Sequence, residues 1–318
     1  MMMTQIQLQW EETACDWCGS TESELFFIGP DRGERLPGEF RLVCCKNCSL
    51  IRQNPRPSWQ SLSQYYPEDY HAFFSLVKDD PQPLRRLNKR YAQRKLRKTM
   101  ERYLDSGRLL EVGCGTGLFL EEMSRSGDWR LVGIEPDRKA ANYVEKHLGF
   151  TVYQDRLSEV ALEAKSFDAV VLWNVLEHLG FPIQDLKKIH HILKDGSWLV
   201  FSIPNLEGLG ARVFHQYWIG WDLPRHLYLY PKDNIYQILD KLGFDIIESK
   251  CISNSYATLG LSLEFWSQSW EDRFPAFKRK FIKLYNSRLI RGILVLPLSI
   301  LDWLKLTTIV TIIAQKRS

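Results

Sequence analysis

The sequence has little that marks a secreted, membrane-spanning or nucleic-acid-binding protein. Residues 1–12 are polar and lack the apolar core of a secretion signal, which predicts a protein kept in the cytoplasm. In that compartment the seven cysteines are not expected to form a disulfide framework. The uncharged run 292–300 is too short to span a bilayer, which takes ~20 apolar residues. A net charge of +4 on 318 residues does not indicate a dedicated nucleic-acid binder.

Two common nucleotide-binding signatures are also missing. A P-loop requires G-x-x-x-x-G-K-[ST], which the sequence does not contain. A dinucleotide fingerprint requires G-x-G-x-x-G, and Leu118 stands where its last glycine belongs. The sequence does have an apolar strand, 109–112, that is followed by Gly113, Gly115 and Gly117. Because glycine has no Cβ and tolerates positive φ, this turn can aim amide N–H groups at a ligand where the next helix begins.

Acidic residues follow the apolar strands beyond this loop. The predicted strand 130–134 ends at Glu135, and a carboxylate at that place can accept hydrogen bonds from both hydroxyls of a ribose. The short strand 150–153 is followed by Asp155. Two further strands are predicted at 166–174 and 198–203. Strands that alternate with helical stretches predict an α/β fold with a parallel sheet.

In this order, the glycine loop, Glu135, Asp155 and the segment 168–178 resemble the motifs of class I S-adenosylmethionine (SAM)-dependent methyltransferases of the type 11/23-like group. The resemblance implies an α/β, Rossmann-like fold with a seven-stranded sheet, and SAM as the cofactor. It also implies that the loop wraps the methionine part and the ribose of SAM, that Glu135 accepts the ribose hydroxyls and that Asp155 reaches the adenine amino group. Cys114 resembles a small filler in this family, and we assign it no chemistry. The expected cofactor-binding residues are Glu111, Gly113, Cys114, Gly115, Thr116, Gly117, Glu135, Asp155 and Asn174.

Four of the seven cysteines form two tight pairs, Cys15-x-x-Cys18 and Cys45-x-x-Cys48. Such pairs predict two turns whose thiolates face one metal ion, and zinc suits a closed site of four thiolates. A closed site leaves no open position for catalysis, so we expect a structural Zn2+ in a small amino-terminal module. Cys44 could replace Cys45 at a looser spacing, but we prefer the x2 spacing. The alternative is four ordinary buried thiols.

The segment between the cysteine module and the glycine loop has a less clear pattern. Residues 85–98 include eight basic residues in fourteen with an irregular apolar stripe, which predicts a helix. Its basic face is either solvated or in contact with anionic lipid headgroups, nucleotide-sugar phosphates or RNA. Residues 49–57 and 65–70 resemble the bridge of zinc-bearing members of the same methyltransferase group. Tyr65, Tyr66 and Tyr70 in this bridge either line the acceptor pocket or pack the bridge against the domain.

An aromatic and polar run, 218–228, follows the fifth strand, where such folds build substrate loops. Residues 222–226 resemble the D-x-P-R-H loop of methyltransferases encoded with cell-surface saccharide and lipid pathways. Arg225 could hold a phosphate or carboxylate, and His226 could transfer a proton or anchor the loop. His178 is the first candidate for a general base and His226 the second, because an imidazole has a suitable pKa. The alternative for His178 is a histidine that shapes the pocket.

A long segment separates the sixth predicted strand, 244–250, from the last, 307–314. It carries basic residues followed by the apolar run, which suits a helix lying in the membrane interface. The alternatives are an ordinary helical cover and a dimer contact. We therefore predict four regions. They are a zinc-binding module (1–58), a bridging helical segment (59–107), a SAM-dependent methyltransferase domain (108–252 and 306–318) and a helical, membrane-interfacial insertion (253–305).

These patterns together predict SAM-dependent transfer of a methyl group to a hydroxyl of a saccharide, a lipid or another small-molecule intermediate. The end of the fourth strand lacks the N/D-P-P-Y signature that many amino-group methyltransferases use, which favours oxygen as the acceptor atom. Three alternatives stay open: an RNA-base methyltransferase, a sugar C-methyltransferase and a catalytically silent SAM-binding partner. The expected partner is a small-molecule, saccharide or lipid-linked acceptor. Peripheral contact at the cytoplasmic membrane face is a further hypothesis.

Overall fold

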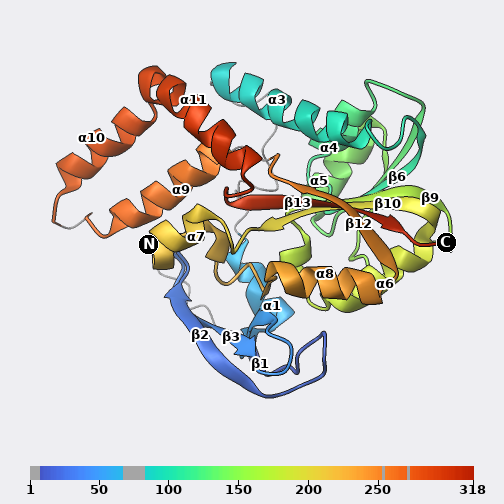
Figure 1. Ribbon diagram of the computed structural model, residues 1–318, viewed down its shortest axis with the longest axis horizontal. Helices are drawn as coiled ribbons and strands as arrows, with labels where there is room; N and C mark the ends of the chain where they lie inside the picture. Colours follow the sequence, from blue (N-terminus) through green and yellow to red (C-terminus); the bar gives the residue numbers. More distant parts are fainter. Residues whose placement is uncertain (1–7, 67–82, 253–254, 271–272) are drawn as a thin grey trace. The chain divides into compact units, whose positions relative to one another are not determined.

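The structure is a computed structural model that describes residues 8–66, 83–252, 255–270 and 273–318. Tyr70, one of the bridge tyrosines, lies outside these residues. The chain forms two compact units (Figure 1). The first unit comprises the described parts of 1–65, 203–235 and 253–310, and the second those of 66–202, 236–252 and 311–318. Each unit therefore gathers segments that are far apart in the sequence.

The second unit is built on the seven-stranded sheet that the sequence predicts (Figure 1), in the order β12-β13-β10-β9-β6-β7-β8. Strands β10, β9, β6, β7 and β8 are parallel, whereas β12 and β13 pair antiparallel. The strands are β6 (Gly107–Val112), β7 (Trp129–Ile134), β8 (Thr151–Tyr153), β9 (Phe167–Trp173), β10 (Leu193–Pro204), β12 (Phe244–Lys250) and β13 (Ile309–Lys316). Because the strand order reverses at β6, the carboxyl ends of β6 and its neighbours form the edge where such folds bind ligands.

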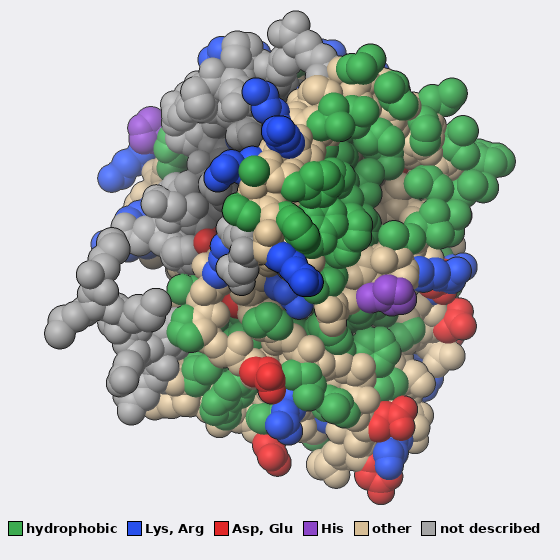
Figure 2. Space-filling view, turned by 90° about the vertical axis from the view of Figure 1, so that its left-hand side faces the viewer, with side chains coloured by type: hydrophobic (Ala, Val, Ile, Leu, Met, Phe, Trp, Pro, Cys, Tyr) green, Lys and Arg blue, Asp and Glu red, His purple; other side chains and the backbone are tan. Residues whose placement is uncertain are grey.

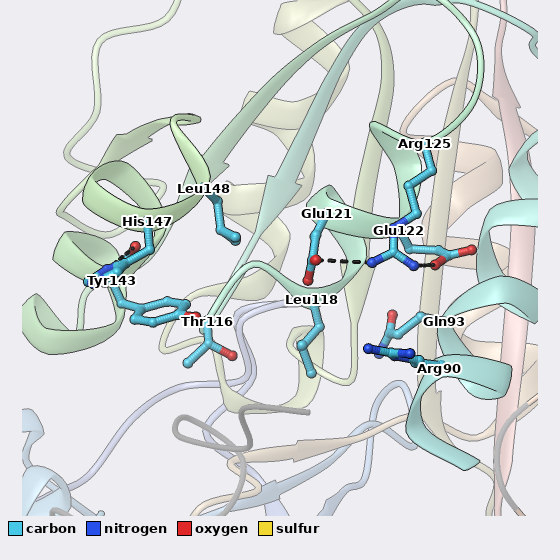
Figure 3. A pocket seen from close by; sticks show the side chains of 10 residues that line it. All are labelled: Arg90, Gln93, Thr116, Leu118, Glu121, Glu122, Arg125, Tyr143, His147 and Leu148. Atoms are coloured by element: carbon cyan, nitrogen blue, oxygen red, sulfur yellow. Dashed lines mark hydrogen bonds and ion pairs between the residues drawn. The ribbon is translucent and has the colours of Figure 1, made fainter. Parts of the chain in front are cut away.

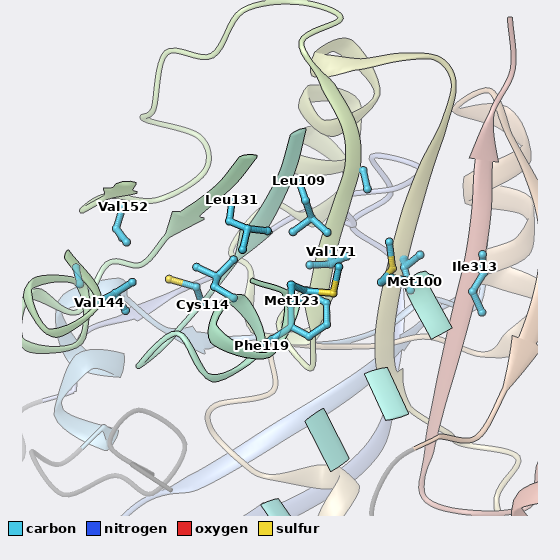
Figure 4. Packing of buried hydrophobic residues seen from close by; sticks show 14 residues of the cluster. Met100, Leu109, Cys114, Phe119, Met123, Leu131, Val144, Val152, Val171 and Ile313 are labelled. Atoms are coloured by element: carbon cyan, nitrogen blue, oxygen red, sulfur yellow. The ribbon is translucent and has the colours of Figure 1, made fainter. Parts of the chain in front are cut away.

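Helices pack on this sheet and bury an apolar core. They are α3 (Pro83–Met100), α4 (Leu118–Met123), α5 (Arg138–Tyr143), the π-helical turn η2 (Val144–Leu148), the 3-10 turn η3 (Leu176–His178), α6 (Pro182–Ile192) and α8 (Lys232–Lys241). The basic segment 85–98 lies within α3, as predicted. Phe119 and Met123 of α4 pack with Leu109 of β6, and Met100 at the end of α3 joins the same cluster (Figure 4). This core supports the loop between β6 and α4.

The first unit contains a four-stranded antiparallel sheet in the order β11-β4-β3-β2. Its strands are β2 (Ser23–Pro30), β3 (Glu39–Cys45), β4 (Ile51–Gln53) and β11 (Tyr228–Leu229), while β1 (Trp10–Glu11) pairs with β5 (Arg56–Pro57). Its short helices are α1 (Trp59–Leu62), η1 (Ser63–Tyr65), α7 (Leu209–Phe214), η4 (His215–Tyr217) and η5 (Ile219–Trp221). Phe40, Leu42, Leu223 and Leu229 are buried together. The run 218–228 therefore folds with the cysteine module, which the sequence did not predict.

Three helices occupy the insertion that the sequence predicts to be helical. They are α9 (Ser255–Gln268), α10 (Pro275–Tyr285) and α11 (Arg288–Trp303), all in the first unit (Figure 1). Within the described part of the chain, no single helix has the length and apolar character needed to cross a membrane. The pair formed by α10 and residues 289–303, bent by 66°, meets that criterion jointly, by length and composition only.

Candidate functional site

The glycine loop leaves β6 in the conformation that its glycines predict. Gly113, Gly115 and Gly117 have φ angles of 70°, 51° and 74°, a region that residues with a Cβ rarely adopt. A Cβ on Gly113 would lie 2.6 Å from Cγ2 of Val175, and one on Gly117 would lie 2.9 Å from Cδ1 of Leu148. The backbone conformation and the close neighbours therefore both require glycine at these two positions.

Glu135 connects the end of β7 to this loop. The residue is 2% exposed, its Oε2 accepts a hydrogen bond from the Gly115 amide at 2.8 Å, and its Oε1 accepts one from the Asp137 amide at 2.8 Å. Burial raises the pKa of Glu135 to about 7 despite these two amide donors. Because each carboxylate oxygen has two lone pairs, both oxygens can hold the backbone and still accept a ribose hydroxyl.

Glu111, near the end of β6, is buried and has an unsatisfied oxygen. Its Oε2 has no hydrogen-bond partner among the residues that the structure describes. Burial and the negative charge of Glu135 raise the pKa of Glu111 well above its ordinary value, although the Leu120 amide opposes this shift. A buried carboxyl oxygen without a partner, next to the glycine loop, fits a ligand that brings N–H donors, such as the amino group of SAM.

Cys114 and Thr116 alternate with the glycines, and both are buried. The Cys114 side chain belongs to the apolar core of the second unit. Burial, followed by the charges of Glu111 and Glu135, raises the pKa of the Cys114 thiol and keeps it neutral. The structure therefore gives the Cys114 side chain a packing role, in agreement with its interpretation as a small filler.

The remaining predicted cofactor residues follow neighbouring strands. Asp155 comes after β8 and is exposed, and its Oδ1 accepts a hydrogen bond from the Arg156 amide at 2.8 Å. Asn174 comes after β9, is exposed and has a φ of 55°. Because β6, β7, β8 and β9 are parallel neighbours, the residues that follow them meet at one edge of the sheet. Glu135, Asp155 and Asn174 therefore share the edge where the glycine loop begins.

A cavity of about 280 Å³ lies beside this loop (Figure 3). It is lined by Arg90, Gln93, Thr116, Leu118, Glu121, Glu122, Arg125, Tyr143, His147 and Leu148. Arg125 forms ion pairs with Glu121 and Glu122 at 3.0 and 3.3 Å. Thr116 is the one predicted cofactor residue in this lining, so we do not equate the cavity with the cofactor site. The sequence does not predict this cavity, because the pattern of residues 85–98 indicates a helix but not the residues against which that helix packs.

His178 ends the turn η3, shortly after Asn174. Its Nδ1 lies 3.2 Å from Oη of Tyr66, and both side chains are partly buried. Both residues belong to the second unit. The structure therefore brings the first candidate base into contact with one of the bridge tyrosines, just beyond the end of β9.

Arg225 and His226 are bound by groups of the first unit. The Nδ1–H of His226, which is 8% exposed, donates to the Gly220 carbonyl at 2.8 Å. Burial lowers the pKa of His226 below its ordinary value, although Asp222 opposes the shift. Arg225 is fully buried, and its guanidinium contacts Asp31 and Asp222, each at 2.7 Å. Two carboxylates of the chain itself therefore occupy the guanidinium of Arg225, in place of the substrate anion that we expected it to hold. The second-choice base role of His226 stays a prediction.

The four cysteines of the predicted metal site lie together in the first unit. Their Sγ atoms are all within 4.8 Å of one another, and the pairs Cys15–Cys48 and Cys18–Cys45 are 3.5 Å apart. Four sulfur atoms bound tetrahedrally at ~2.3 Å from zinc are ~3.8 Å apart, so the cluster fits a zinc ion. The Cys44 Sγ approaches backbone carbonyls instead, which fits the preferred x2 spacing.

Both cysteine pairs form the same turn. In each, the amide of the first cysteine donates to the carbonyl five residues later, at 2.9 and 3.0 Å. Gly19 and Ser49 occupy equivalent positions in the two turns, with φ angles of 75° and 63°. Burial raises the pKa of Cys18, but hydrogen bonds from Asn47 and the Ser20 amide bring it down to about 6. This favours the thiolate at Cys18, which is the form that binds a metal ion. Burial raises the pKa of Cys15 and Cys48 instead, so these two thiols would have to lose their protons when a metal ion binds.

A comparison with protein families agrees with the geometry of the glycine loop. A family model described as a methyltransferase domain matches residues 84–249, just over half of the chain. The chain belongs to the class I SAM-dependent methyltransferases. This confirms the resemblance drawn from the sequence. SAM is the cofactor that the loop, Glu135 and the unsatisfied oxygen of Glu111 fit in this methyltransferase.

Curated relatives match part of this methyltransferase. A ubiquinone biosynthesis O-methyltransferase from Cereibacter sphaeroides is 27% identical over 154 residues, and one from Ruegeria pomeroyi is 30% identical over 159 residues. Each match covers 45% of this chain and 62% of the relative, so the chain spans less than two thirds of these relatives' length. A methyltransferase solved in a complex with the Haloferax volcanii Trm112 activator is 11% identical, with a TM-score of 0.50 over 73% of this chain and 91% of that one, which shows the fold alone.

We expect Glu135→Ala to weaken SAM binding at least about a hundredfold, because the variant loses two charge-assisted acceptors and the contact that holds Gly115. We expect the ribose hydroxyls to donate to the ionised carboxylate, and burial raises the pKa of Glu135 to about 7. Wild-type affinity should therefore rise as the pH increases through this value, because protons no longer compete for the carboxylate. Calorimetric titration with S-adenosylhomocysteine on both sides of neutrality measures both effects.

The neutral variant Glu135→Gln should bind the ligand weakly and without this pH dependence. The exposed carboxylate of Glu145 provides the control, and Glu145→Gln should bind as the wild type does. Unchanged affinity in Glu135→Ala would contradict the assignment.

Proposed function

We propose that this methyltransferase transfers the SAM methyl group to a hydroxyl of a saccharide, a lipid or another small-molecule biosynthetic intermediate. The contact between His178 and Tyr66, just beyond β9, is the observation that carries the proposal. An imidazole suits removal of a hydroxyl proton near neutral pH. The relatives named for O-methyl transfer in ubiquinone biosynthesis support the same acceptor atom.

SAM supplies an electrophilic methyl group when bound, so the protein has to position the acceptor and remove its proton. His178 accepts that proton on Nε2 in our proposal. Its Nδ1–H then donates to Oη of Tyr66, a contact that fixes both the tautomer and the orientation of the ring. Glu135 and Glu111 hold the ribose and amino groups of the cofactor, which fixes the donor against the acceptor.

We also propose that the thiolates of Cys15, Cys18, Cys45 and Cys48 hold a structural zinc ion. The sulfur distances support this assignment. Four protein sulfurs fill the tetrahedral coordination of zinc and leave no open position for a substrate. The ion therefore stabilises the fold of the first unit and takes no part in methyl transfer.

We expect His178→Gln to lower turnover by about a hundredfold or more, because the acceptor hydroxyl loses its general base. SAM affinity should change little, since His178 is not among the residues expected to bind the cofactor. Tyr66→Phe should lower turnover less, because the imidazole remains and only its orientation is released. Steady-state methylation and calorimetric SAM binding separate the two effects.

The exposed His191 provides a matched control for this experiment, and His191→Gln should turn over as the wild type does. Unchanged turnover in His178→Gln would remove this residue from the mechanism.

The acceptor class is tested by incubating the protein with labelled SAM and a fractionated cell extract. We expect label in the saccharide, lipid or small-molecule fractions, in a form that hot hydriodic acid releases, because this acid cleaves O-methyl ethers and spares C-methyl groups. Label confined to RNA, or retained after the acid treatment, would overturn the proposal of hydroxyl methylation.

A further inference from the structure

Helix α11 carries a stripe of large apolar side chains that is open to solvent. Leu289, Ile293, Leu296, Ile300 and Trp303 are 71%, 57%, 68%, 48% and 80% exposed. Their spacing of four and three residues places them on one face of the helix. We call these five residues the α11 stripe. An apolar face of this extent is rare on a protein surface unless it meets a partner.

Helix α10, which comes just before α11 in the chain, carries exposed cations. Arg279, Lys280 and Lys283 are exposed, and the sequence of α10 contains no acidic residue. The sequence of α11 contains one, Asp302, whose carboxylate accepts hydrogen bonds from Ser255 and from Thr307. Figure 2 shows apolar side chains gathered on the face that carries these helices, with Lys and Arg side chains next to them. The two helices therefore present both apolar and positively charged side chains to solvent.

We propose that α10 and α11 form a docking surface for a lipid bilayer that contains anionic lipids. The α11 stripe lies in the boundary between headgroups and acyl chains, and Arg279, Lys280 and Lys283 contact the lipid phosphates. Trp303, at the end of the stripe, has the amphipathic ring that favours this boundary. We infer a bilayer with anionic lipids as the partner because the exposed cations of α10 are complementary in charge to such a surface.

Two other arrangements fit the same residues less well. A symmetric contact with a second copy of the chain would bring two sets of α10 cations together, and α10 and α11 offer no uncommitted carboxylate to pair with them. Insertion of α11 alone across the bilayer is disfavoured by length, because its 16 residues span ~24 Å and the hydrocarbon core is ~30 Å thick. The pair of α10 and residues 289–303 is long enough, but its bend of 66° prevents one straight span. Docking parallel to the membrane surface satisfies both constraints.

This proposal goes beyond methyl transfer and does not depend on it, because vesicle binding is measured without SAM or an acceptor. Flotation of the whole 318-residue chain with vesicles provides the test, using phosphatidylcholine alone or phosphatidylcholine mixed with phosphatidylglycerol. We expect flotation with the mixed vesicles and little with phosphatidylcholine alone. Added salt should weaken flotation, because it screens the α10 cations.

Two sets of variants separate the charged and apolar contributions. Arg279→Glu, Lys280→Glu and Lys283→Glu together should weaken binding to the mixed vesicles by about a hundredfold or more. Ile293→Gln, Leu296→Gln and Trp303→Gln together should weaken it at least about tenfold, because they remove the buried apolar area. Both variants should keep the SAM affinity and the thermal transition of the wild type, since the substituted side chains are exposed.

Each set has a control of equal size elsewhere on the protein. Arg138→Glu, Lys146→Glu and Lys187→Glu reverse three exposed cations, and Leu25→Gln, Val213→Gln and Ile247→Gln replace three exposed apolar residues. Both controls should float as the wild type does. Equal flotation of the α10 or α11 variants and the wild type would overturn the proposal. A dimer that the α11 variant converts to a monomer, with flotation unchanged, would assign the surface to a second copy instead.

Discussion

Replacing Cys48 by serine, or removing the metal with a chelator, should unfold the amino-terminal part of the first unit. The four thiolates lie within 4.8 Å of one another, and without an ion they repel each other or must take up protons. None of the four cysteines belongs to the apolar cluster around Phe40 and Leu42, so the packing of that cluster does not replace the metal ion in holding the two turns together. Structural zinc sites contribute ~10–16 kcal/mol of apparent binding free energy in small peptides, which makes this the largest effect that we expect. Metal analysis and thermal denaturation measure the zinc content and the loss of structure.

Cys44 provides a control one residue away from the cluster. Its Sγ approaches backbone carbonyls and not the other thiols, so Cys44→Ser should keep the zinc ion. The free energy of unfolding of the Cys44→Ser variant should differ from that of the wild type by no more than ~1 kcal/mol. Two results would refute the zinc assignment: a reconstituted wild-type protein that holds no zinc, and a Cys48→Ser variant that melts together with Cys44→Ser.

The sequence predicts those parts of the fold that depend on single residues or on residues close together in the chain. The glycines of the loop have positive φ because residues with a Cβ avoid that conformation, and the sequence shows this directly. The two cysteine pairs form equivalent turns because their spacing sets the geometry. Apolar runs of strand length that alternate with helical stretches predict the parallel part of the sheet, but not the order of its strands.

The role of Glu135 was predicted in part. Its place after a buried strand indicated a ribose acceptor, but not the hydrogen bond that it accepts from the Gly115 amide. That bond couples two predicted motifs, because the carboxylate that we expect to hold the ribose also holds the loop beside it. A substitution at Glu135 should therefore disturb both contacts together.

The contacts that the sequence could not predict join segments far apart in the chain. Strand β11 is two residues long and pairs with β4, so it shows no alternating pattern that would reveal it. Arg225 lies 194 residues from its partner Asp31. The aromatic and polar composition of residues 218–228 is equally compatible with a substrate loop and with an internal anchor, and only the tertiary contacts distinguish the two.

Arg225→Ala should destabilise the first unit by ~3–5 kcal/mol, because it leaves the carboxylates of Asp31 and Asp222 without the cation that neutralises them. Burial lowers the pKa of Arg225, but the two carboxylates raise it overall, so the guanidinium is charged in the folded protein. Arg225→Lys should recover part of the loss, since an ammonium supplies charge but not the planar fork that contacts two carboxylates. Urea denaturation measures these differences.

The exposed Arg212 of α7 provides the control, and Arg212→Ala should change the free energy of unfolding by less than ~0.5 kcal/mol. If the loss in Arg225→Ala comes from unpaired buried charge, neutralising the partners should reverse it. Combining the variant with Asp31→Asn and Asp222→Asn should therefore restore part of the stability, although it removes further groups from the native structure. An Arg225→Ala variant as stable as Arg212→Ala would contradict this account, because it would mean that hydrogen bonds from water or neighbouring amides stabilise both carboxylates without Arg225.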